Sequence, residues 1–210
     1  MNQDQLIQLD SIEIKNEKKI EIILTNIIKM LTDRKLLKRE NMEKNIENVI
    51  NQHDDNLFFK INLDLPNKEY GEDIYVKLTN HTIVSFGKNS SLYAFLQGND
   101  DKYILLIVNS IGDRGEENIK NKYPKIELFK EVELMINLME HHLVPKHILL
   151  NEEEAAEVLR EYNVTKRQFQ KIIAKEPVAR YFNAKPGMIF KIYQYSILTG
   201  YSINYRYTIK

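Results

Sequence analysis

The segment Glu176-Pro177-Val178-Ala179-Arg180-Tyr181-Phe182, followed by the turn Lys185-Pro186-Gly187, carries most of the information in this 210-residue chain. A proline at the first helical position has its φ angle already set for a helix, and the preceding glutamate can cap orphan amides. One short helical turn is therefore predicted. Asn183 can leave that turn in the left-handed conformation, and the order Pro-Gly predicts a type II turn. These features are typical of a rigid assembly module and not of a catalytic centre.

A small α+β unit is predicted around this segment. Asn151 is expected to begin a helix as its N-cap, with Glu154 completing a capping box. Thr165 is expected to cap a second short helix that carries Phe169 and Ile172. The final strand alternates cleanly, with Ile203, Tyr205, Tyr207 and Ile209 on one face and Ser202, Asn204, Arg206 and Thr208 on the other.

Helical periodicity dominates the first fifty residues. Apolar side chains recur with i, i+3, i+4 spacing over residues 20–31 and again over 42–50, which predicts two helices with buried faces. Arg34 and Lys35 lie near the end of the first helix, where cations interact favourably with the helix dipole. Both apolar stripes are expected to pack into a core.

Strand patterns occupy the middle of the chain. Alternation over residues 57–65 and short β-branched runs at 74–76 and 82–84 predict strands. A short helix is expected at 89–96. The continuous apolar run 103–108 predicts a central strand that is covered on both faces.

The order of helix and strand patterns predicts an α+β or mixed protein, and its length and hydrophobic content are enough for two domains. An α/β domain over residues 1–139 and a small α+β domain over 140–210 are expected, each with a modest core of its own. No apolar run reaches eighteen residues, so no membrane contact is expected. The chain has no cysteine, which excludes disulfides, thiolate zinc sites and a cysteine nucleophile.

Charge divides unevenly along a chain whose net charge is zero. From His141 onward, eleven Lys and Arg outnumber six Asp and Glu, so the remainder of the chain is net acidic. An acidic amino-terminal part is poorly suited to strong, sequence-independent DNA binding, which needs clustered cations.

The residues from about 140 to the end resemble the carboxy-terminal domain of the fifth subunit shared by eukaryotic RNA polymerases I, II and III, a family with a shorter archaeal counterpart. The matching residues are Glu140–His147, Glu176–Phe182, Lys185, Gly187, Lys191, Ile192, Gly200, Tyr205 and Arg206. The residues before 140 resemble the amino-terminal jaw domain of that subunit in layout, through a helix pair, a strand-rich middle and the segment 133–137. Archaeal relatives lack the jaw, so the length indicates the eukaryotic form or that of a large DNA virus.

This resemblance implies a non-catalytic subunit of a multisubunit DNA-directed RNA polymerase, with no cofactor and no metal. It would dock on the largest polymerase subunit, among other polymerase subunits, and lie near downstream duplex DNA without reading its sequence. The residues expected to bind the largest subunit are Pro145, His147, Pro177, Arg180, Tyr181, Gly187, Tyr205 and Arg206. A cellular polymerase implies a nuclear location, and a viral one implies a cytoplasmic viral factory or the virion.

Arg180 is expected at the interface with the largest subunit. Its guanidinium can clamp a carboxylate with paired hydrogen bonds, and the alternative is an internal salt bridge with Glu157 or Glu161. The family usually has Gly where Asn183 stands, Arg where Pro186 and Gln194 stand, and Pro where Tyr195 stands. The missing arginines indicate a changed partner surface, and this divergence favours a large DNA virus as the source.

Arg114 and Lys120 are the candidates for contact with DNA phosphates, in a region that the family places near downstream DNA. The preceding loop has two glycines and a helix start, which could hold a phosphate on backbone amides, but it lacks the lysine and hydroxyl of a P-loop. Asp113, Glu116 and Glu117 would repel phosphate. The sequence therefore supports two interpretations of this segment equally, an ordinary exposed turn and a contact with DNA.

Two functions of other classes also remain open. A metal-dependent nuclease would need converging carboxylates and often a lysine, for which the available residues are Asp64, Asp73, Lys77, Asp100, Asp101 and Lys102. Solvated loop carboxylates explain these residues more simply. A free nucleic-acid-binding factor could use the basic carboxy-terminal part. His141, His142 and His147 match no standard zinc spacing, and the resemblance implies structural roles for the first and third.

Overall fold

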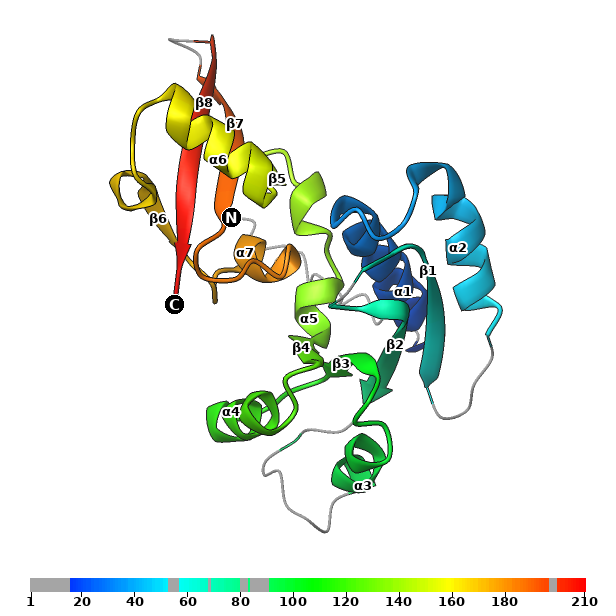
Figure 1. Cartoon of the computed structure of the whole chain (residues 1–210). Helices are drawn as coiled ribbons and strands as arrows, with labels where there is room; N and C mark the ends of the chain where they lie inside the picture. The colour runs from blue at the N-terminus through cyan, green and yellow to red at the C-terminus, as the bar shows by residue number, and fades with distance from the viewer. Residues whose placement is uncertain (1–15, 53–56, 68, 80–82, 84–90, 197–199) are drawn as a thin grey trace, which may run out of the picture.

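The computed structural model describes residues 16–52, 57–67, 69–79, 83, 91–196 and 200–210, which form two domains (Figure 1). The sheet of the amino-terminal domain has the order β1-β2-β3-β4, formed by Phe58–Asn67, Gly71–Thr79, Tyr103–Val108 and Ile126–Lys130. β1 and β2 are an antiparallel hairpin, whereas β2, β3 and β4 run parallel. The predicted strand at 82–84 lies outside the described residues except for Ile83, which forms an isolated bridge with Ile111.

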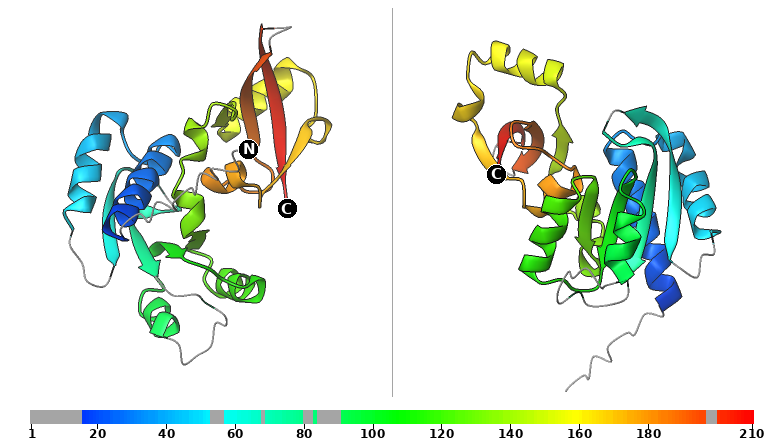
Figure 2. Two further views of the ribbon diagram at one scale, coloured as in Figure 1. Left: turned by 180° about the vertical axis from the view of Figure 1, so that it is seen from behind. Right: turned by 60° about the horizontal axis from the view of Figure 1, so that its bottom comes forward.

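Helices cover both faces of this sheet (Figure 2). One face packs against α1 (Asn16–Asp33) and α2 (Met42–Ile50), which follows the short 3-10 helix η1 (Arg39–Asn41). The other face packs against α3 (Ser91–Gln97) and α4 (Asp113–Lys122), and α5 (Glu131–Leu134) follows β4. Every residue of β3 is buried, which confirms the prediction of a central strand covered on both faces.

The carboxy-terminal domain is built on a second sheet of order β5-β7-β8-β6. Its strands are Lys146–Leu149, Ile189–Ser196, Gly200–Ile209 and Gln170–Ile173, and only β6 runs parallel to its neighbour. The remaining elements are the 3-10 helices η2 (Leu138–Glu140) and η3 (Lys166–Gln168) and the helices α6 (Glu152–Glu161) and α7 (Pro177–Tyr181).

Two local predictions in this domain have different outcomes. Asn151 and Glu154 form the expected reciprocal capping box of α6, with bonds of 2.7 and 2.8 Å. The second predicted helix is wrong in extent. η3 ends at Gln168, and Ile172 belongs to β6 instead, where it is buried in register with Thr208.

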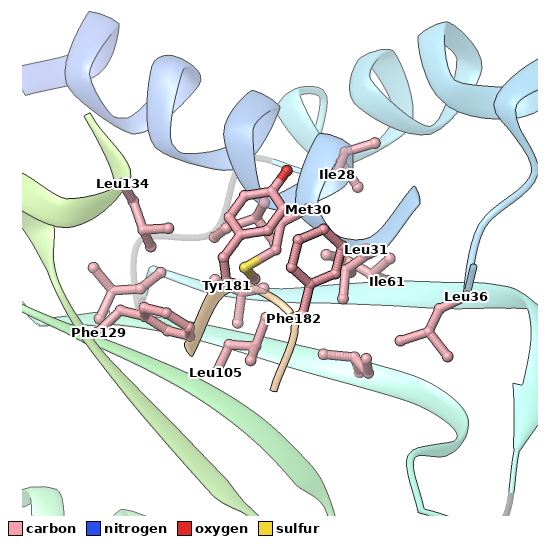
Figure 3. Packing of buried hydrophobic residues seen from close by; sticks show 14 of the residues in the cluster. Ile28, Met30, Leu31, Leu36, Ile61, Leu105, Phe129, Leu134, Tyr181 and Phe182 are labelled. Atoms are coloured by element: carbon pink, nitrogen blue, oxygen red, sulfur yellow. The ribbon is translucent and has the colours of Figure 1, made fainter. Parts of the chain in front are cut away.

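The expectation of two separate cores is also wrong. One continuous cluster of buried residues runs from α1, α2 and β1–β3 into α7 and β7 of the other domain. Figure 3 shows Tyr181 and Phe182 inserted between α1 and the amino-terminal sheet, beside Met30, Leu105 and Phe129. Only the layers under α3 and α4 and under α6 form clusters of their own. Separate cores were expected from chain length and composition, which bound the size of a core but cannot identify which elements pack together.

Candidate docking surfaces and the joint between the domains

The segment from 176 to 183 forms the predicted helical turn, with one correction. Pro177 occupies the first turn of α7, and Asn183 leaves the helix with φ +50°, as predicted. Glu176 stands at the N-cap position, but its carboxylate accepts no bond from the amides of α7. It accepts instead from the backbone N–H of Ile173, at 2.9 Å. Since that amide ends β6, Glu176 ties the strand to the helix that follows.

The turn at Gly187 has the predicted geometry. Met188 N donates to Lys185 O at 3.1 Å, and Gly187 has φ +102°, as a type II turn requires. A Cβ at Gly187 would meet no atom within 4 Å, so the need for glycine comes from the backbone angle and not from lack of space. Gly187 N also donates to Thr208 O at 2.9 Å, which joins the turn to β8.

Arg180 points into the interface between α7 and the amino-terminal domain, which is called the joint below. Its Nη1 forms an ion pair with Glu133 at 2.5 Å, and its Nη2 donates to Leu128 O at 2.7 Å. The guanidinium carbon lies 5.2 Å from the centre of the Phe129 ring. The expected internal partners Glu157 and Glu161 are therefore wrong, because α7 faces the amino-terminal domain and not α6.

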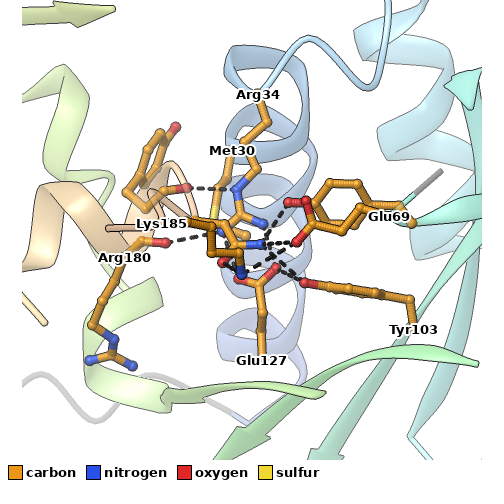
Figure 4. A network of polar contacts seen from close by, with 10 residues as sticks. Met30, Arg34, Glu69, Tyr103, Glu127, Arg180 and Lys185 are labelled. Atoms are coloured by element: carbon orange, nitrogen blue, oxygen red, sulfur yellow. Dashed lines mark hydrogen bonds and ion pairs between the residues drawn. The ribbon is translucent and has the colours of Figure 1, made fainter. Parts of the chain in front are cut away.

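Arg34 anchors the other end of α7, a role that its position near the end of α1 did not indicate. Its Nε donates to Tyr181 O at 2.7 Å and its Nη2 to Arg180 O at 3.1 Å. Both Nη atoms also bond Glu127 at 2.8 Å, and the two side chains are only 2% and 12% exposed (Figure 4). Arg34 thus satisfies the carbonyls at the end of a helix from the other domain, while Glu127 compensates its buried charge.

Burial and charge act in opposite directions on the pKa of Arg34. Burial alone would lower it, but the adjacent Glu127 carboxylate raises it above its ordinary value. Burial raises the pKa of Tyr103, whose hydroxyl donates to Glu127 at 2.6 Å, and the nearby carboxylate raises it further. The charged guanidinium of Arg34 and the neutral phenol of Tyr103 are thus the stable protonation states across the physiological pH range.

Further contacts complete the joint. Asn183 Nδ2 donates to the hydroxyls of Tyr70 at 2.8 Å and Tyr103 at 3.1 Å. Tyr181 donates to Asp33 at 2.8 Å, and burial, followed by the charge of Asp33, raises the pKa of Tyr181. Asn183 therefore contributes interdomain hydrogen bonds that a glycine could not make.

One sequence signal could have indicated this network. Glu127 is the one carboxylate within the short strand β4 (Ile126–Lys130), between residues that are buried. A carboxylate among buried residues needs a buried cation. Pattern alone does not say that the cation is Arg34, which lies 93 positions earlier in the chain.

Three of the expected partner-binding residues meet in one groove on the carboxy-terminal sheet. The groove has a volume of about 380 Å³, and Pro145, His147 and Arg206 lie along it with the apolar Ile192. His147 Nδ1 donates to Pro145 O at 2.6 Å. Burial lowers the pKa of His147, although the bond to Pro145 raises it, and nearby Arg206 lowers it further. The imidazole is therefore neutral near pH 7.

Tyr205 lies on the opposite face of β8 from Arg206. Its ring packs against Tyr162 and Phe169, with centroid distances of 5.6 and 5.4 Å, under α6. Of the remaining expected residues, Tyr181 is buried in the joint, Gly187 shapes the turn and Pro177 is exposed at the start of α7. The expected set therefore does not form one surface.

The end of the β7–β8 hairpin is a second outward surface. β5 pairs with β7 only as far as Tyr193, and β6 pairs with β8 only from Arg206 onward, so the hairpin extends beyond both neighbours (Figure 1). Among the residues of the hairpin end that the structure describes, large apolar side chains are exposed at Tyr195 (63%), Tyr201 (83%) and Ile203 (46%).

The two DNA-proximal candidates differ in their surroundings. Arg114 is exposed in the first turn of α4. Lys120 forms an ion pair with Glu116 at 2.6 Å. Burial favours the neutral form of Glu116, but Lys120 holds its pKa below the ordinary value. The charge of Lys120 is therefore largely compensated by Glu116, so Arg114 is the more available cation of the two.

Several lysines near α3 and α4 lie over aromatic rings. Lys122 Nζ is 4.0 Å from the centre of the Tyr93 ring, and Lys102 Nζ is 4.8 Å from that of Tyr75. Lys125 is exposed nearby and donates to Asp101 O. Lysines that alternate with aromatic rings are typical of surfaces that contact nucleic-acid backbones.

The proposed nuclease residues are dispersed. Asp73 pairs with Lys60 at 2.8 Å across the β1–β2 hairpin, and Asp64 accepts from Lys38 N and Asn41. Within the described residues, no group of three or more His, Asp or Glu side chains is placed to hold a metal ion. None of the described helices is both long and apolar enough to cross a bilayer.

Comparison with known proteins defines the family. Residues 136–208 match the family described as RNA polymerase Rpb5, C-terminal domain. The DNA-directed RNA polymerase subunit 5 of Acanthamoeba polyphaga mimivirus is 30% identical over 206 residues, covering 92% of this chain and 94% of that protein. Because this similarity extends over nearly all of both chains, the present chain belongs to the RNA polymerase subunit 5 family.

Cellular relatives match shorter regions. The subunit RPABC1 of DNA-directed RNA polymerases I, II and III from Caenorhabditis briggsae is 35% identical over 113 residues, covering 53% of this chain and 54% of that protein. The polymerase subunit Rpo5 of the archaeon Saccharolobus solfataricus is 48% identical over 69 residues, covering 33% of this chain and 82% of that protein. The chain thus spans about half the length of the nematode relative, while the archaeal relative matches only a third of the chain.

Proposed function

We propose that this chain is a non-catalytic subunit of a DNA-directed RNA polymerase that docks on the largest subunit and holds its amino-terminal domain beside downstream DNA. The observation that carries this proposal is the division of the carboxy-terminal domain into two sides. α7 is covered by the amino-terminal domain, whereas the groove at Arg206 and the hairpin end remain uncovered in the described part of the chain. A rigid joint and an outward surface together allow docking of one domain to set the position of the other.

The outward surface has the chemistry of a protein interface. Aromatic residues and arginine are enriched at such interfaces because they bury large areas and offer directional contacts. Tyr195, Tyr201 and Ile203 form the apolar part of this surface, and Pro145, His147 and Arg206 form the groove beside it. We assign direct contact with the largest subunit to these residues.

Arg180, Tyr181 and Gly187 contribute to docking through the joint. The polar side-chain atoms of Arg180 and Tyr181 form hydrogen bonds with the amino-terminal domain, and Gly187 sets the turn that leads into β7. Their replacement would therefore alter how the amino-terminal domain is held relative to the docking surface.

The amino-terminal domain would approach DNA through its α3–α4 side. Arg114, Lys102, Lys122 and Lys125 supply separate cations there, and the overall acidity of this part of the chain keeps such contacts weak. Contacts to phosphates position a protein on DNA without reading its sequence. In a cellular polymerase this subunit would act in the nucleus, and in a viral enzyme it would act in the viral factory or the virion.

The test is affinity purification of the tagged chain from its native source, followed by mass spectrometry. We expect stoichiometric recovery of the two large polymerase subunits, and a loss of at least about tenfold for Tyr201→Asp, since a buried unpaired charge is costly at an interface. Leu65→Asp, at an exposed position of the amino-terminal domain, is the matched control and should keep full recovery. Recovery of the chain alone or with nucleic acid only would overturn the proposal.

A further inference from the structure

A larger hollow lies between the two domains, separate from the hairpin end. It has a volume of about 910 Å³ and is lined by the end of α1, the β1–β2 turn, the segment from η2 to β5 and the residues after α7. A volume of this size accommodates several side chains of a peptide. Of the residues assigned to the docking surface, only His147 also lines this cleft, so the rest of the cleft has no role in the proposed polymerase function.

The floor of the cleft is apolar and rich in methionine. Met42, Met139 and Met188, three of the six methionines in the chain, line it together with Leu149 and Phe182. Met42, Met139 and Leu149 also pack against the continuous core, so the floor is firmly supported. Unbranched, polarisable methionine side chains adapt to differently shaped apolar residues, and they are common on surfaces that bind peptides.

The carboxylates on the lining of the cleft are already compensated. The ion pairs are Asp33 with Arg39 at 3.8 Å, Glu69 with Lys185 at 3.3 Å and Glu140 with Lys29 at 2.7 Å. A ligand would therefore meet little uncompensated negative charge.

Two lysines on the lining remain without an ion pair to any described residue. Lys35 lies on the α1 side and Lys146 on the β5 side, and both are exposed. Positive charge on either side of an apolar floor is complementary to an anionic, apolar ligand.

The backbone at Lys35 gives independent support. Lys35 has φ +62° at the end of α1, where Leu36 N donates to Leu31 O at 3.0 Å. Glycine adopts this left-handed position at a helix end at the lowest conformational cost. A lysine held in that conformation places a cation at the cleft in spite of the cost, which is the kind of strain found at binding sites.

We propose that this cleft binds an acidic peptide segment with large apolar side chains, supplied by another protein. The apolar side chains would pack on the methionine floor, and the carboxylates would pair with Lys35 and Lys146. A nucleic-acid strand fits less well, because its charged backbone would leave the apolar floor without an apolar partner.

The test begins with selection of random twelve-residue peptides displayed on phage against the full chain. We expect the enriched peptides to combine Asp or Glu with Leu, Met or Phe. Synthetic copies with a fluorescent label are then measured by anisotropy. The variant Lys35→Glu/Lys146→Glu should weaken binding at least tenfold, whereas the control Lys18→Glu/Lys171→Glu, at exposed positions outside the cleft, should bind as the unmodified chain does.

A second variant separates charge from folding. Lys35→Gly removes the cation and relaxes the left-handed backbone, so it should weaken peptide binding without lowering the midpoint of thermal unfolding. The proposal would be overturned if the peptide bound Lys35→Gly and the double glutamate variant as tightly as it binds the unmodified chain. Absence of enrichment, enrichment of peptides without acidic residues, or displacement of the peptide by an equal concentration of a single-stranded DNA dodecamer would overturn it as well. Because the assay uses the isolated chain, its failure leaves the pull-down of polymerase subunits unaffected.

Discussion

The two ends of the carboxy-terminal domain are both rich in aromatic residues, yet they have opposite environments. At α7, Tyr181 and Phe182 are each 8% exposed and pack against the amino-terminal domain. At the hairpin end, Tyr195 and Tyr201 are 63% and 83% exposed. Composition cannot distinguish an aromatic residue that is buried between the domains from one that is exposed and available to another protein. Only the surrounding elements determine which surface is covered.

The joint and the hairpin end also differ in how the hydrogen-bonding groups of their backbone are satisfied. α7 has only five residues, and helices this short are unstable alone, so its terminal carbonyls depend on Arg34, which directly follows α1. The hairpin end keeps its internal pairs, but beyond β5 and β6 its edges pair with no other strand of the described residues. The joint should therefore be sensitive to substitutions in unfolding experiments, and the hairpin end should be sensitive mainly in assembly experiments.

Replacement of Arg34 by Met in the joint should cause the largest loss in the free energy of unfolding. It leaves the Glu127 carboxylate buried without a cation and removes the hydrogen bonds that Arg34 donates to Tyr181 O and Arg180 O, which should lower the free energy of unfolding by about 3–5 kcal/mol. Urea-induced unfolding followed by circular dichroism measures this change.

Controls for this substitution sharpen the comparison. Arg39→Met, at a side chain that is 83% exposed and 3.8 Å from Asp33, should change the free energy of unfolding by less than about 0.5 kcal/mol. The double variant Arg34→Met/Glu127→Leu should recover part of the loss, since it removes the unpaired charge. A loss below about 1 kcal/mol for Arg34→Met would contradict a structural role for the ion pair.

Phe182→Ala should have the next largest effect on stability. The ring is buried in the continuous core and lies 5.7 Å from the Phe190 ring in an edge-to-face arrangement, so its removal leaves a cavity. We expect a loss of about 3 kcal/mol in thermal unfolding. Tyr201→Ala at the hairpin end should cost less than about 0.5 kcal/mol, and equal costs at the two positions would remove the distinction between joint and surface.

Arg180→Ala should give an intermediate effect. The substitution removes a partly exposed ion pair with Glu133, a hydrogen bond to Leu128 O and the contact with the Phe129 ring, for an expected loss of about 1–2 kcal/mol. Incorporation into the polymerase should also fall, which affinity purification measures. Unchanged stability with reduced incorporation would instead place Arg180 in direct contact with the partner.

Gly187→Ala should destabilise the chain through its backbone alone. A φ of +102° disfavours a Cβ although the space is empty, so we expect a loss of about 1 kcal/mol in urea unfolding. Gly98→Ala is the matched control, because its added Cβ would make only ordinary contacts of 3.5 and 3.7 Å. A neutral result for Gly187→Ala would mean that the turn relaxes at little cost.

The smallest expected effect is a pH dependence that originates at His147. Its pKa is lowered in the folded state, so the unfolded chain binds more protons once the pH falls through the ordinary pKa of histidine. Stability should therefore be full above about pH 7 and decrease as the pH falls through 6.5 towards the lowered folded-state pKa. His147→Gln should reduce this slope in urea unfolding at a series of pH values, and an unchanged slope would assign it to other groups.

Local predictions succeeded where neighbouring residues determine the conformation. The capping box at Asn151, Pro177 at the first turn of α7 and the positive φ of Gly187 all follow from interactions within four residues, and the structure confirms them. The burial of β3 on both faces also followed from its apolar run. Predictions of side-chain partners failed more often. Glu176 bonds Ile173, and Arg180 bonds Glu133, because these choices depend on which elements are brought together.

The sequence by itself determined the α+β class, most helices and strands and, through its resemblance, the polymerase subunit family. These properties depend on local periodicity, capping and turn chemistry, and on motifs that survive as short runs of residues. Only the tertiary structure decided that α7 is a joint, that Arg34 and Glu127 hold it, and that Tyr205 and Arg206 lie on opposite sides of the sheet. A buried charge takes its partner from whichever segment packs beside it, and chain topology determines that choice over distances that no local pattern can encode.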